Sequence, residues 1–191
     1  TGVSYLGAGA WRLRVDPVRP GERAALSWVG VDLLETDPVT GKTTGLARTA
    51  RKALKAMNGA EVPFSVIGAT ALAVRGLPRM SRDLDLVVLV DDADVAIEAL
   101  RAAGLQSTRP THDGDERVFV DPATDVEVDL LVAAGDPEAT VVDQAQAATV
   151  FGATAPVASL EHLLLLYLYS NQPKHLGDFA SIVQSGRADL K

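Results

Sequence analysis

The stretch "RMSRDLDLVVLVDD", residues 79–92, places two carboxylates at the start of a strongly apolar segment. Asp83 and Asp85 are separated by one residue, and an almost unbroken apolar run follows as far as Val90. A short apolar run bounded by polar residues is typical of a buried strand. Because residues two apart on a strand point to the same side, both carboxylates are predicted to lie on one face of it.

The segment before these acids predicts a strand that turns directly into a helix. "FSVIG" (64–68) is typical of a buried strand, and "ATALAVRG" (69–76) of a short helix that ends at its glycine. Gly68 allows the backbone to approach a ligand closely. The amides at the helix start, at Ala69 and Thr70, are free to hold a phosphate, and Thr70 adds a hydroxyl. We therefore expect this corner to face the two acids.

Two neighbouring carboxylates repel each other unless a positive charge neutralises them. Mg²⁺ fits this role, because it binds one or two carboxylates together with phosphate oxygens. A third acid, Asp129, interrupts the apolar strand "VEVDLLVA", which "DPATD" joins to "ERVFVD" in a predicted hairpin. Three such acids can hold two metal ions that clamp the attacking and leaving oxygens of a displacement. The sequence therefore predicts a metal site made of Asp83, Asp85 and Asp129.

These motifs resemble the nucleotidyltransferase superfamily, and within it the AbiEii-type and minimal nucleotidyltransferase toxin group. That group carries Gly-Gly-Thr-Ala-Leu and then Arg-x-Ser-x-Asp-x-Asp. The matching residues are Gly68, Thr70, Ala71, Leu72, Arg79, Ser81, Asp83, Asp85 and, by order and strand context, Asp129. Lys174 and Asp178 match part of a pattern in the final helices of the group, and the resemblance covers roughly residues 45–190. Ala69, Tyr167 and His175 depart from it: they stand where members often carry Gly, Lys and Asp.

The resemblance implies an α+β fold with a polymerase-β-like mixed sheet, flanking helices and C-terminal helices. It implies Mg²⁺-dependent transfer of a nucleoside monophosphate from an NTP to an acceptor hydroxyl, with the 3′ end of a tRNA as first choice. Asp83, Asp85 and Asp129 would be the catalytic metal ligands. The expected nucleotide contacts are Gly68, Ala69, Thr70, Arg79, Ser81, Lys174 and Asp178. A cognate antitoxin would be a protein partner.

Other acceptors and one other class of protein remain open at this point. The acceptor hydroxyl can instead belong to a protein or to an aminoglycoside or lincosamide antibiotic. The alternative class is a degenerate member that binds nucleotide or a partner protein without turnover. The departures at Ala69, Tyr167 and His175 favour that alternative.

The chain divides into a small N-terminal appendage, residues 1–43, and a nucleotidyltransferase domain, residues 44–191, whose helical part begins near residue 158. The appendage contains two β-like runs, "WRLRV" and "LSWVGVDLLE", compatible with a hairpin. A helix is expected at 45–58, with Leu46, Ala50, Leu54 and Met57 on one face, and another at 91–105, capped by an acid. Further helices are expected at 138–148, 159–170 and 173–186. The helix at 159–170 is expected to bury an apolar stripe that includes Tyr167 and Leu168.

Composition excludes several classes of function. The 191 residues have a formal net charge of −7, which argues against a large surface that coats nucleic acid but not against a local basic groove. The absence of cysteine excludes disulfides and thiolate chemistry. No apolar run approaches the roughly 18 residues of a membrane helix, and the N-terminus lacks a signal-peptide pattern, so we expect a cytoplasmic protein without a membrane partner. "TGKTTG" (40–45) is not a phosphate-binding P-loop, because Thr36 stands where that motif requires glycine, and a hairpin turn is expected instead.

Overall fold

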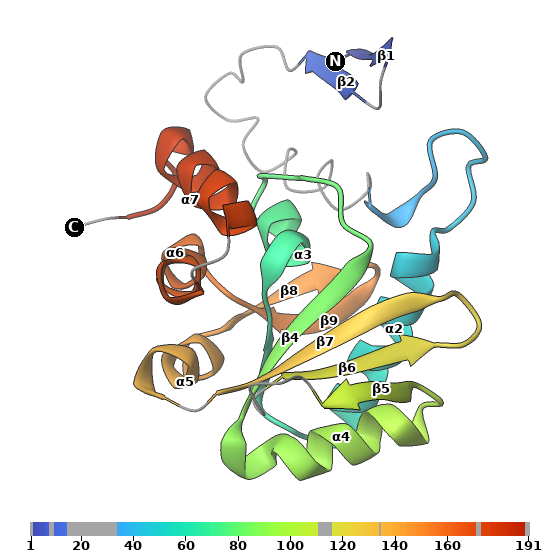
Figure 1. Cartoon of the computed structure of the whole chain (residues 1–191), viewed down its shortest axis with the longest axis vertical. Coiled ribbons are helices and arrows are strands. Elements are labelled where there is room, and N and C mark those ends of the chain that lie inside the picture. Colours follow the sequence, from blue (N-terminus) through green and yellow to red (C-terminus); the bar gives the residue numbers. More distant parts are fainter. Residues whose placement is uncertain are drawn as a thin grey trace.

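The computed structural model describes residues 2–7, 10–14, 34–110, 116–133, 135–170 and 173–189. Its main body is a mixed seven-stranded sheet with helices on both faces (Figure 1). The strand order is β5 (Gln106–Pro110), β6 (Glu116–Asp121), β7 (Val126–Ala133), β4 (Asp83–Leu89), β3 (Phe64–Val66), β9 (Ala153–Val157) and β8 (Gln146–Val150). The pairs β4–β7 and β3–β9 are parallel and the other neighbours are antiparallel, so the predicted mixed sheet is confirmed.

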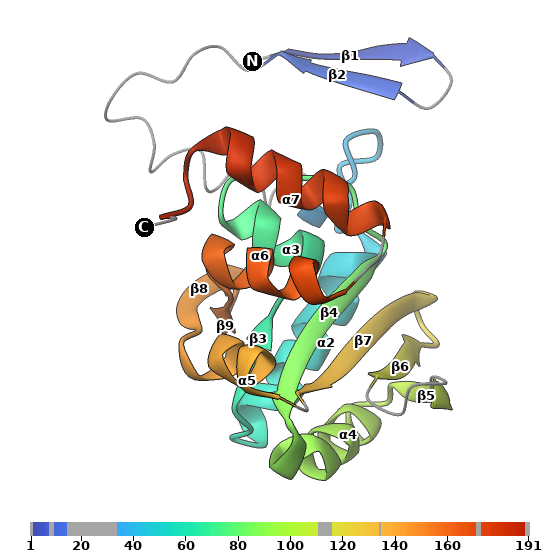
Figure 2. The same cartoon turned by 60° about the vertical axis from the view of Figure 1, so that its left-hand side comes forward.

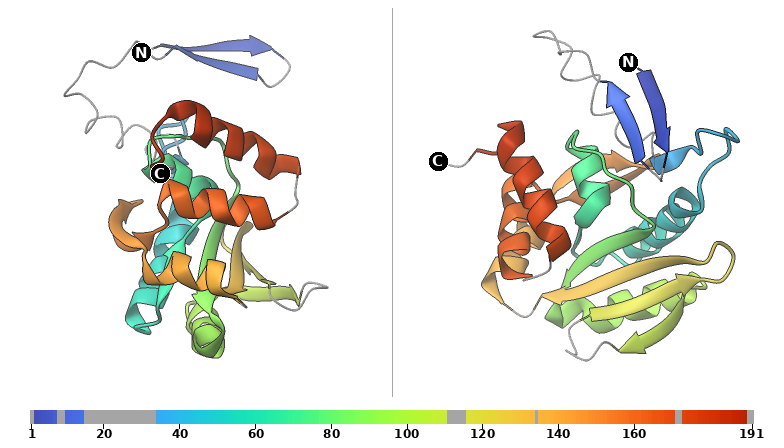
Figure 3. Two further views of the ribbon diagram at one scale, coloured as in Figure 1. Left: turned by 90° about the vertical axis from the view of Figure 1, so that its left-hand side faces the viewer. Right: turned by 45° about the horizontal axis from the view of Figure 1, so that its top comes forward.

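Helices cover the two faces of the sheet unequally. The helices α2 (Gly45–Gly59) and α4 (Ala93–Ala102) pack together on one face, and a 3₁₀ turn, η1 (Val90–Asp92), leads into α4. On the opposite face α5 (Asp136–Asp143) contacts the centre of the sheet. Beyond it α6 (Leu160–Tyr169) lies on α5, and α7 (Pro173–Ser185) lies on α6 (Figures 2 and 3). The short helix α3 (Gly68–Val74) follows β3 and contacts β4.

The helix α2 forms for reasons that are local in the sequence. Its predicted apolar stripe, Leu46, Ala50, Leu54 and Met57, is buried in the core. Thr44 caps the helix, since its hydroxyl accepts a hydrogen bond from the amide of Ala47 at 3.1 Å. The prediction for this segment is therefore confirmed to within one residue.

A buried polar link joins α2 to the turn after β6. The Asp121 carboxylate accepts hydrogen bonds from Lys52 Nζ at 2.7 Å and from the Thr49 hydroxyl at 3.1 Å. The amide of Ala123 also donates to this carboxylate at 3.1 Å. Asp121 is only 1% exposed, so its charge depends on these donors.

The prediction of a helix over residues 138–148 was wrong in its second half. The helix α5 ends at Asp143, and β8 begins at Gln146. A turn through Phe151 and Gly152, both with positive φ, returns the chain as β9. Neither β8, β9 nor β5 was predicted, because these strands carry little apolar alternation and form by pairing with a neighbour.

Two smaller expectations about helices were also wrong. Leu168 was expected on the buried stripe of α6 but is 62% exposed. Apolar residues occupy all sides of this helix, so periodicity does not locate the buried face. Asp92 occupies the N-cap position of α4 as expected, but its side chain makes no capping hydrogen bond.

The N-terminal region is described in part. The strands β1 (Gly2–Gly7) and β2 (Ala10–Arg14) form a separate antiparallel pair, and residues 26–33 of the second β-like run lie outside the described residues. The division into residues 1–43 and 44–191 stays a prediction. The segment around "TGKTTG" forms the expected turn, in which Thr36 bridges to Thr43. No helix in the described ranges is both long enough and apolar enough to cross a lipid bilayer.

Candidate active site

The structure brings together the three carboxylates that the sequence predicted. Parallel pairing of β4 with β7 places Asp85 directly opposite Asp129, and Asp83 opposite Glu127. One carboxylate oxygen from each of Asp83, Asp85 and Asp129 lies within 4.8 Å of the other two. All three residues, hereafter the acidic triad, are partly buried. Residues far apart in the sequence therefore form one compact group of like charges.

Gly68 lies against this triad and has no room for a side chain. Its φ is +62°, a left-handed conformation that favours glycine. A Cβ added there would lie 2.0 Å from Asp85 Oδ2, far inside contact distance. The neighbouring amide of Ile67 donates to the Asp85 carbonyl oxygen at 3.0 Å. The corner between β3 and α3 is therefore fitted closely to Asp85.

The other predicted residues of this corner lie deeper. Ala69 and Thr70 are fully buried and are not among the residues that line the pocket described below. The Thr70 hydroxyl makes no hydrogen bond to any residue that the structure describes. Contact of Ala69 and Thr70 with phosphate therefore stays a prediction.

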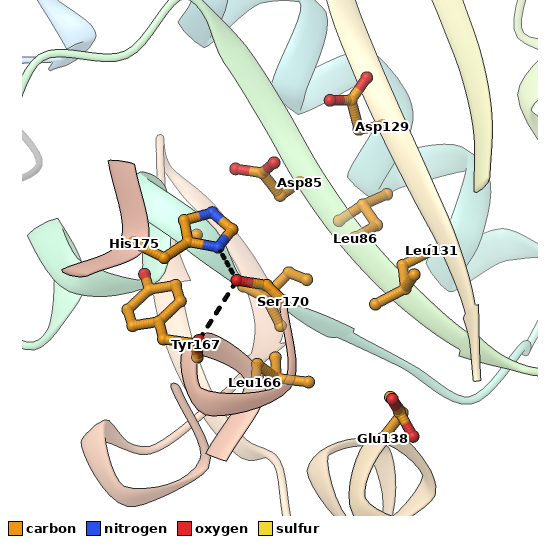
Figure 4. A pocket seen from close by; sticks show the side chains of 11 residues that line it. Asp85, Leu86, Asp129, Leu131, Glu138, Leu166, Tyr167, Ser170 and His175 are labelled. Carbon is orange, nitrogen blue, oxygen red and sulfur yellow. Dashed lines mark hydrogen bonds between the residues drawn. The ribbon is translucent and has the colours of Figure 1, made fainter. Parts of the chain in front are cut away.

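A pocket of about 270 Å³ opens beside the acidic triad (Figure 4). Its described lining consists of Ile67, Gly68, Asp85, Leu86, Asp129, Leu131, Glu138, Leu166, Tyr167, Ser170 and His175. The sheet supplies Asp85 and Asp129, and Glu138 on α5 lies toward the opposite end of the lining. These lining residues include three acids and no lysine or arginine.

The donor set of the triad fits a hard divalent cation. Carboxylate oxygens are the ligands that Mg²⁺ binds, usually together with phosphate oxygens of a substrate. Carboxylates this close repel one another, and a bound cation would offset that repulsion. Asp83, Asp85 and Asp129 are therefore the residues in the described part of the chain that could hold such an ion.

Arg79, Ser81 and Asp178, which were predicted to contact nucleotide, each have a partner within the protein. The Ser81 hydroxyl donates to Asp83 Oδ1 and so orients a member of the triad. Arg79 Nε lies 2.9 Å from the carboxylate of Asp178, which is 8% exposed. This ion pair ties α7 to the loop before β4. The three residues are not in the described pocket lining, and the side chain of Lys174 lies outside the described part of the chain, so their nucleotide contacts stay predictions.

The pocket wall formed by α6 and α7 carries an aromatic pair. The rings of Tyr167 and His175 lie with centroids 4.8 Å apart and planes tilted by 32°. The Ser170 hydroxyl is hydrogen-bonded to His175 Nδ1. Figure 4 shows all three side chains on the same wall.

The Tyr167 hydroxyl is buried and makes no hydrogen bond to any described residue. Burial raises the pKa of this hydroxyl above its ordinary value, and the carboxylate of Asp178 raises it further. Arg79 opposes the rise in pKa, and Asp85 adds to it. The phenol therefore keeps its proton at neutral pH and can act as a hydrogen-bond donor.

Sequence reasoning missed part of this lining. Tyr167 was expected only as a buried residue that departs from a family pattern, and His175 only as such a departure. Glu138, Leu166 and Ser170 were not predicted. Leu166 and Ser170 are four residues apart and so share one face of α6, but nothing local shows that this face turns to a pocket. Glu138 lies in the first turn of α5, where an acid is common because it interacts favourably with the helix dipole. Its presence in the sequence therefore gave no sign of a pocket.

Comparison with solved structures places this geometry among known folds. The antibiotic-resistance factor ANT(2'')-Ia superposes with a TM-score of 0.55 at 17% identity, over 73% of this chain and 83% of that one. Its complex with adenylyl-2"-tobramycin superposes with a TM-score of 0.55 at 16% identity, over 73% of this chain and 88% of that one. The lincosamide antibiotic adenylyltransferase LnuA, bound to lincomycin, superposes with a TM-score of 0.52 at 12% identity, over 71% of this chain and 95% of that one. The chain has the nucleotidyltransferase fold.

The likeness to nucleotidyltransferases extends to the fold alone, because these identities are low. No protein-family profile matches the chain, and no curated protein sequence matches it. The predicted superfamily fold is therefore confirmed. Membership of the AbiEii-type group stays a prediction that depends on the motifs.

Proposed function

We propose that this protein is a metal-dependent nucleotidyltransferase that moves a nucleoside monophosphate from an NTP to an acceptor hydroxyl. The observation that carries the proposal is the acidic triad, whose carboxylate oxygens lie within 4.8 Å of one another. The triad faces a glycine corner and a pocket within a nucleotidyltransferase fold. Asp83, Asp85 and Asp129 hold Mg²⁺ in this proposal.

The reaction forms one bond and breaks another at the α-phosphorus. The acceptor oxygen bonds to this phosphorus, the bond to the oxygen that bridges to the β-phosphate breaks, and pyrophosphate leaves. When bound, Mg²⁺ supplies positive charge that offsets the charge of the triphosphate. Asp129 accepts the proton of the acceptor hydroxyl, and Ser81 holds Asp83 in place. Gly68 leaves room for Asp85 to keep its orientation.

Of the three acceptor classes, tRNA, protein and small molecule, two have support of their own. The motif resemblance favours the 3′ end of a tRNA, with a cognate antitoxin as partner. The structures of ANT(2'')-Ia and LnuA instead hold small antibiotic ligands, adenylyl-2"-tobramycin and lincomycin. The described pocket lining favours the small-molecule class for this chain, because RNA-binding sites rely on lysine and arginine and this lining has neither.

A labelling assay tests the proposal. The protein is incubated with Mg²⁺ and each NTP labelled at the α-phosphate, with total RNA, an aminoglycoside or a lincosamide as acceptor. We expect label on one acceptor class, lost with a chelator and reduced at least about 100-fold in Asp83→Asn and Asp129→Asn. Asp91→Asn is the matched control, because Asp91 is exposed just beyond β4 and outside the triad.

Two outcomes would contradict the proposal. Label transfer that persists in Asp83→Asn would remove the triad from the chemistry. Nucleotide binding without any labelled product, including product on protein, would favour the alternative of a binding protein without turnover.

A further inference from the structure

The pocket carries negative charge at both of its ends. Asp85 and Asp129 lie at one end, and Glu138 on α5 lies toward the other (Figure 4). The described lining has no lysine or arginine to balance these acids. Fixed charges of one sign in a concave site focus the electric field inside it, so the pocket attracts cations and disfavours anions. A ligand that fills the whole pocket must match this charge.

Mg²⁺ at the acidic triad accounts for only one end of this charge. The carboxylate oxygens that lie within 4.8 Å of one another belong to the triad and do not include those of Glu138. Glu138 is therefore not placed to bind the same ion. His175 is the one residue of the described lining that can become a cation, and Figure 4 shows it well away from Glu138. The negative charge of Glu138 is left for a ligand to match.

A favourable interaction with the helix dipole does not by itself explain why Glu138 lies at the pocket. An acid in the first turn of a helix has this interaction whichever way its side chain faces. The first turn of α5 has a second acid, Asp136, which is exposed and is not in the described pocket lining. Asp136 thus serves the helix dipole without contact with the pocket, which makes it the matched control for Glu138.

The part of the pocket between its two ends is small and largely apolar. Leu131 comes two residues after Asp129 and so lies on the same face of β7, and Leu166 contributes to the lining from α6. The volume of about 270 Å³ is near the lower end of the range for small-molecule sites. An ammonium group forms a charge-assisted hydrogen bond with a carboxylate. The lining therefore fits a compact organic molecule that carries an amino group.

We infer that Glu138 is a specificity-determining residue that selects an acceptor with a positively charged amino group. The ammonium group donates a hydrogen bond to the Glu138 carboxylate, and a hydroxyl of the same molecule lies beside Asp129 at the other end of the pocket. This inference rests on the proposed function for the reaction, and it names the acceptor class as small aliphatic amines that also carry hydroxyls.

The test compares Glu138→Gln with Asp136→Asn in the full chain. Calorimetry measures binding of two hydroxylated amines, 2-deoxystreptamine and tobramycin, and of their neutral N-acetylated forms. Each titration contains Mg²⁺ and an NTP analogue with a methylene group between the α- and β-phosphates, so that the nucleotide end of the site is occupied. The wild type is expected to bind at least one amine about 10-fold more tightly than its N-acetylated form.

The two variants are expected to differ in amine binding alone. Glu138→Gln should weaken the amine about 10-fold and leave its N-acetylated form unchanged, whereas Asp136→Asn should change neither. Glu138→Asp, which keeps the charge, should retain most of the preference for the amine. Affinity for the NTP analogue should be the same in all variants, and both neutralised variants should lose a similar, small amount of thermal stability. In the labelling assay, Glu138→Gln should raise KM for the amine with little change in kcat.

Each other outcome has a defined meaning. Unchanged amine affinity in Glu138→Gln, or an equal loss in Asp136→Asn, overturns the inference and leaves the proposed function intact. A wild type that binds the amines no better than their N-acetylated forms, or that labels only RNA, also overturns the inference alone. A fall in unfolding temperature several degrees larger in Glu138→Gln than in Asp136→Asn shows a structural carboxylate instead. Amine binding that depends on Glu138 in a protein that transfers no label to any acceptor overturns only the proposed function.

Discussion

Replacing Gly68 by alanine adds a single methyl group beside the acidic triad and so tests the site directly. In Gly68→Ala the new Cβ would lie 2.0 Å from Asp85 Oδ2, on a backbone with φ of +62°. We expect Asp85 to turn away, Mg²⁺ binding and nucleotidyl transfer to fall below detection, and the free energy of unfolding to decrease by about 1–2 kcal/mol. Calorimetric Mg²⁺ titration, the labelling assay and denaturant unfolding measure these effects.

Gly104→Ala separates backbone strain from the collision with Asp85. Gly104 has a φ of +87°, but a Cβ added there meets no atom within 4 Å. This variant should lose similar stability and still bind Mg²⁺ as the wild type does. If Gly68→Ala also bound Mg²⁺ normally, the close fit between the glycine corner and the triad would have no functional meaning.

At the scale of elements, Asp121 connects α2 to the sheet. Asp121→Asn leaves Lys52 without its 2.7 Å partner and weakens the bond from Thr49. We expect the free energy of unfolding to fall by roughly 1–3 kcal/mol at pH 7, without loss of Mg²⁺ binding, because the acidic triad is elsewhere. Asp125→Asn, an exposed change in the same turn, is the control and should change stability by less than about 0.5 kcal/mol.

The same link predicts a pH dependence. Burial raises the pKa of Asp121, but hydrogen bonds from Lys52, Ala123 and Thr49 outweigh it and hold the pKa below its ordinary value. A carboxyl with a lower pKa in the folded state adds stability that is complete above the unfolded-state pKa, about 3.9, and lost as pH falls through the folded value. The stability difference between wild type and Asp121→Asn should therefore be constant from about pH 7 to 5 and shrink below about pH 4. A difference that grew in acid would contradict this assignment.

At the scale of the whole molecule, cation binding should be visible as stability. The acidic triad exists only when β4 and β7 are paired, so Mg²⁺ binds the folded chain and not the unfolded one. At 100 times its dissociation constant, Mg²⁺ should add about 2.7 kcal/mol to the free energy of unfolding. Thermal unfolding with increasing MgCl₂ measures this, with NaCl at equal ionic strength as the control. Asp129→Asn should lose most of the gain, and an equal gain in that variant would show that the ion binds elsewhere.

Much of this protein could be predicted from local sequence patterns. The apolar run after Asp83 and Asp85, the amphipathic helix α2 and the hairpin of β6 and β7 each carry their own signal within a few residues. Asp129 stood out because it interrupts the apolar run of β7, and the structure places it opposite Asp85. The superfamily fold and the acidic triad were therefore accessible from the sequence.

Only the tertiary structure decided the remaining features. The strands β5, β8 and β9 form because a neighbour offers backbone donors and acceptors, not because of their own composition. The apolar residues of α6 surround the helix, so its stacking between α5 and α7 determined that Tyr167 and Ser170 line the pocket and Leu168 remains exposed. Local residue order sets which elements can form, whereas burial against distant elements sets which of their faces meets the site.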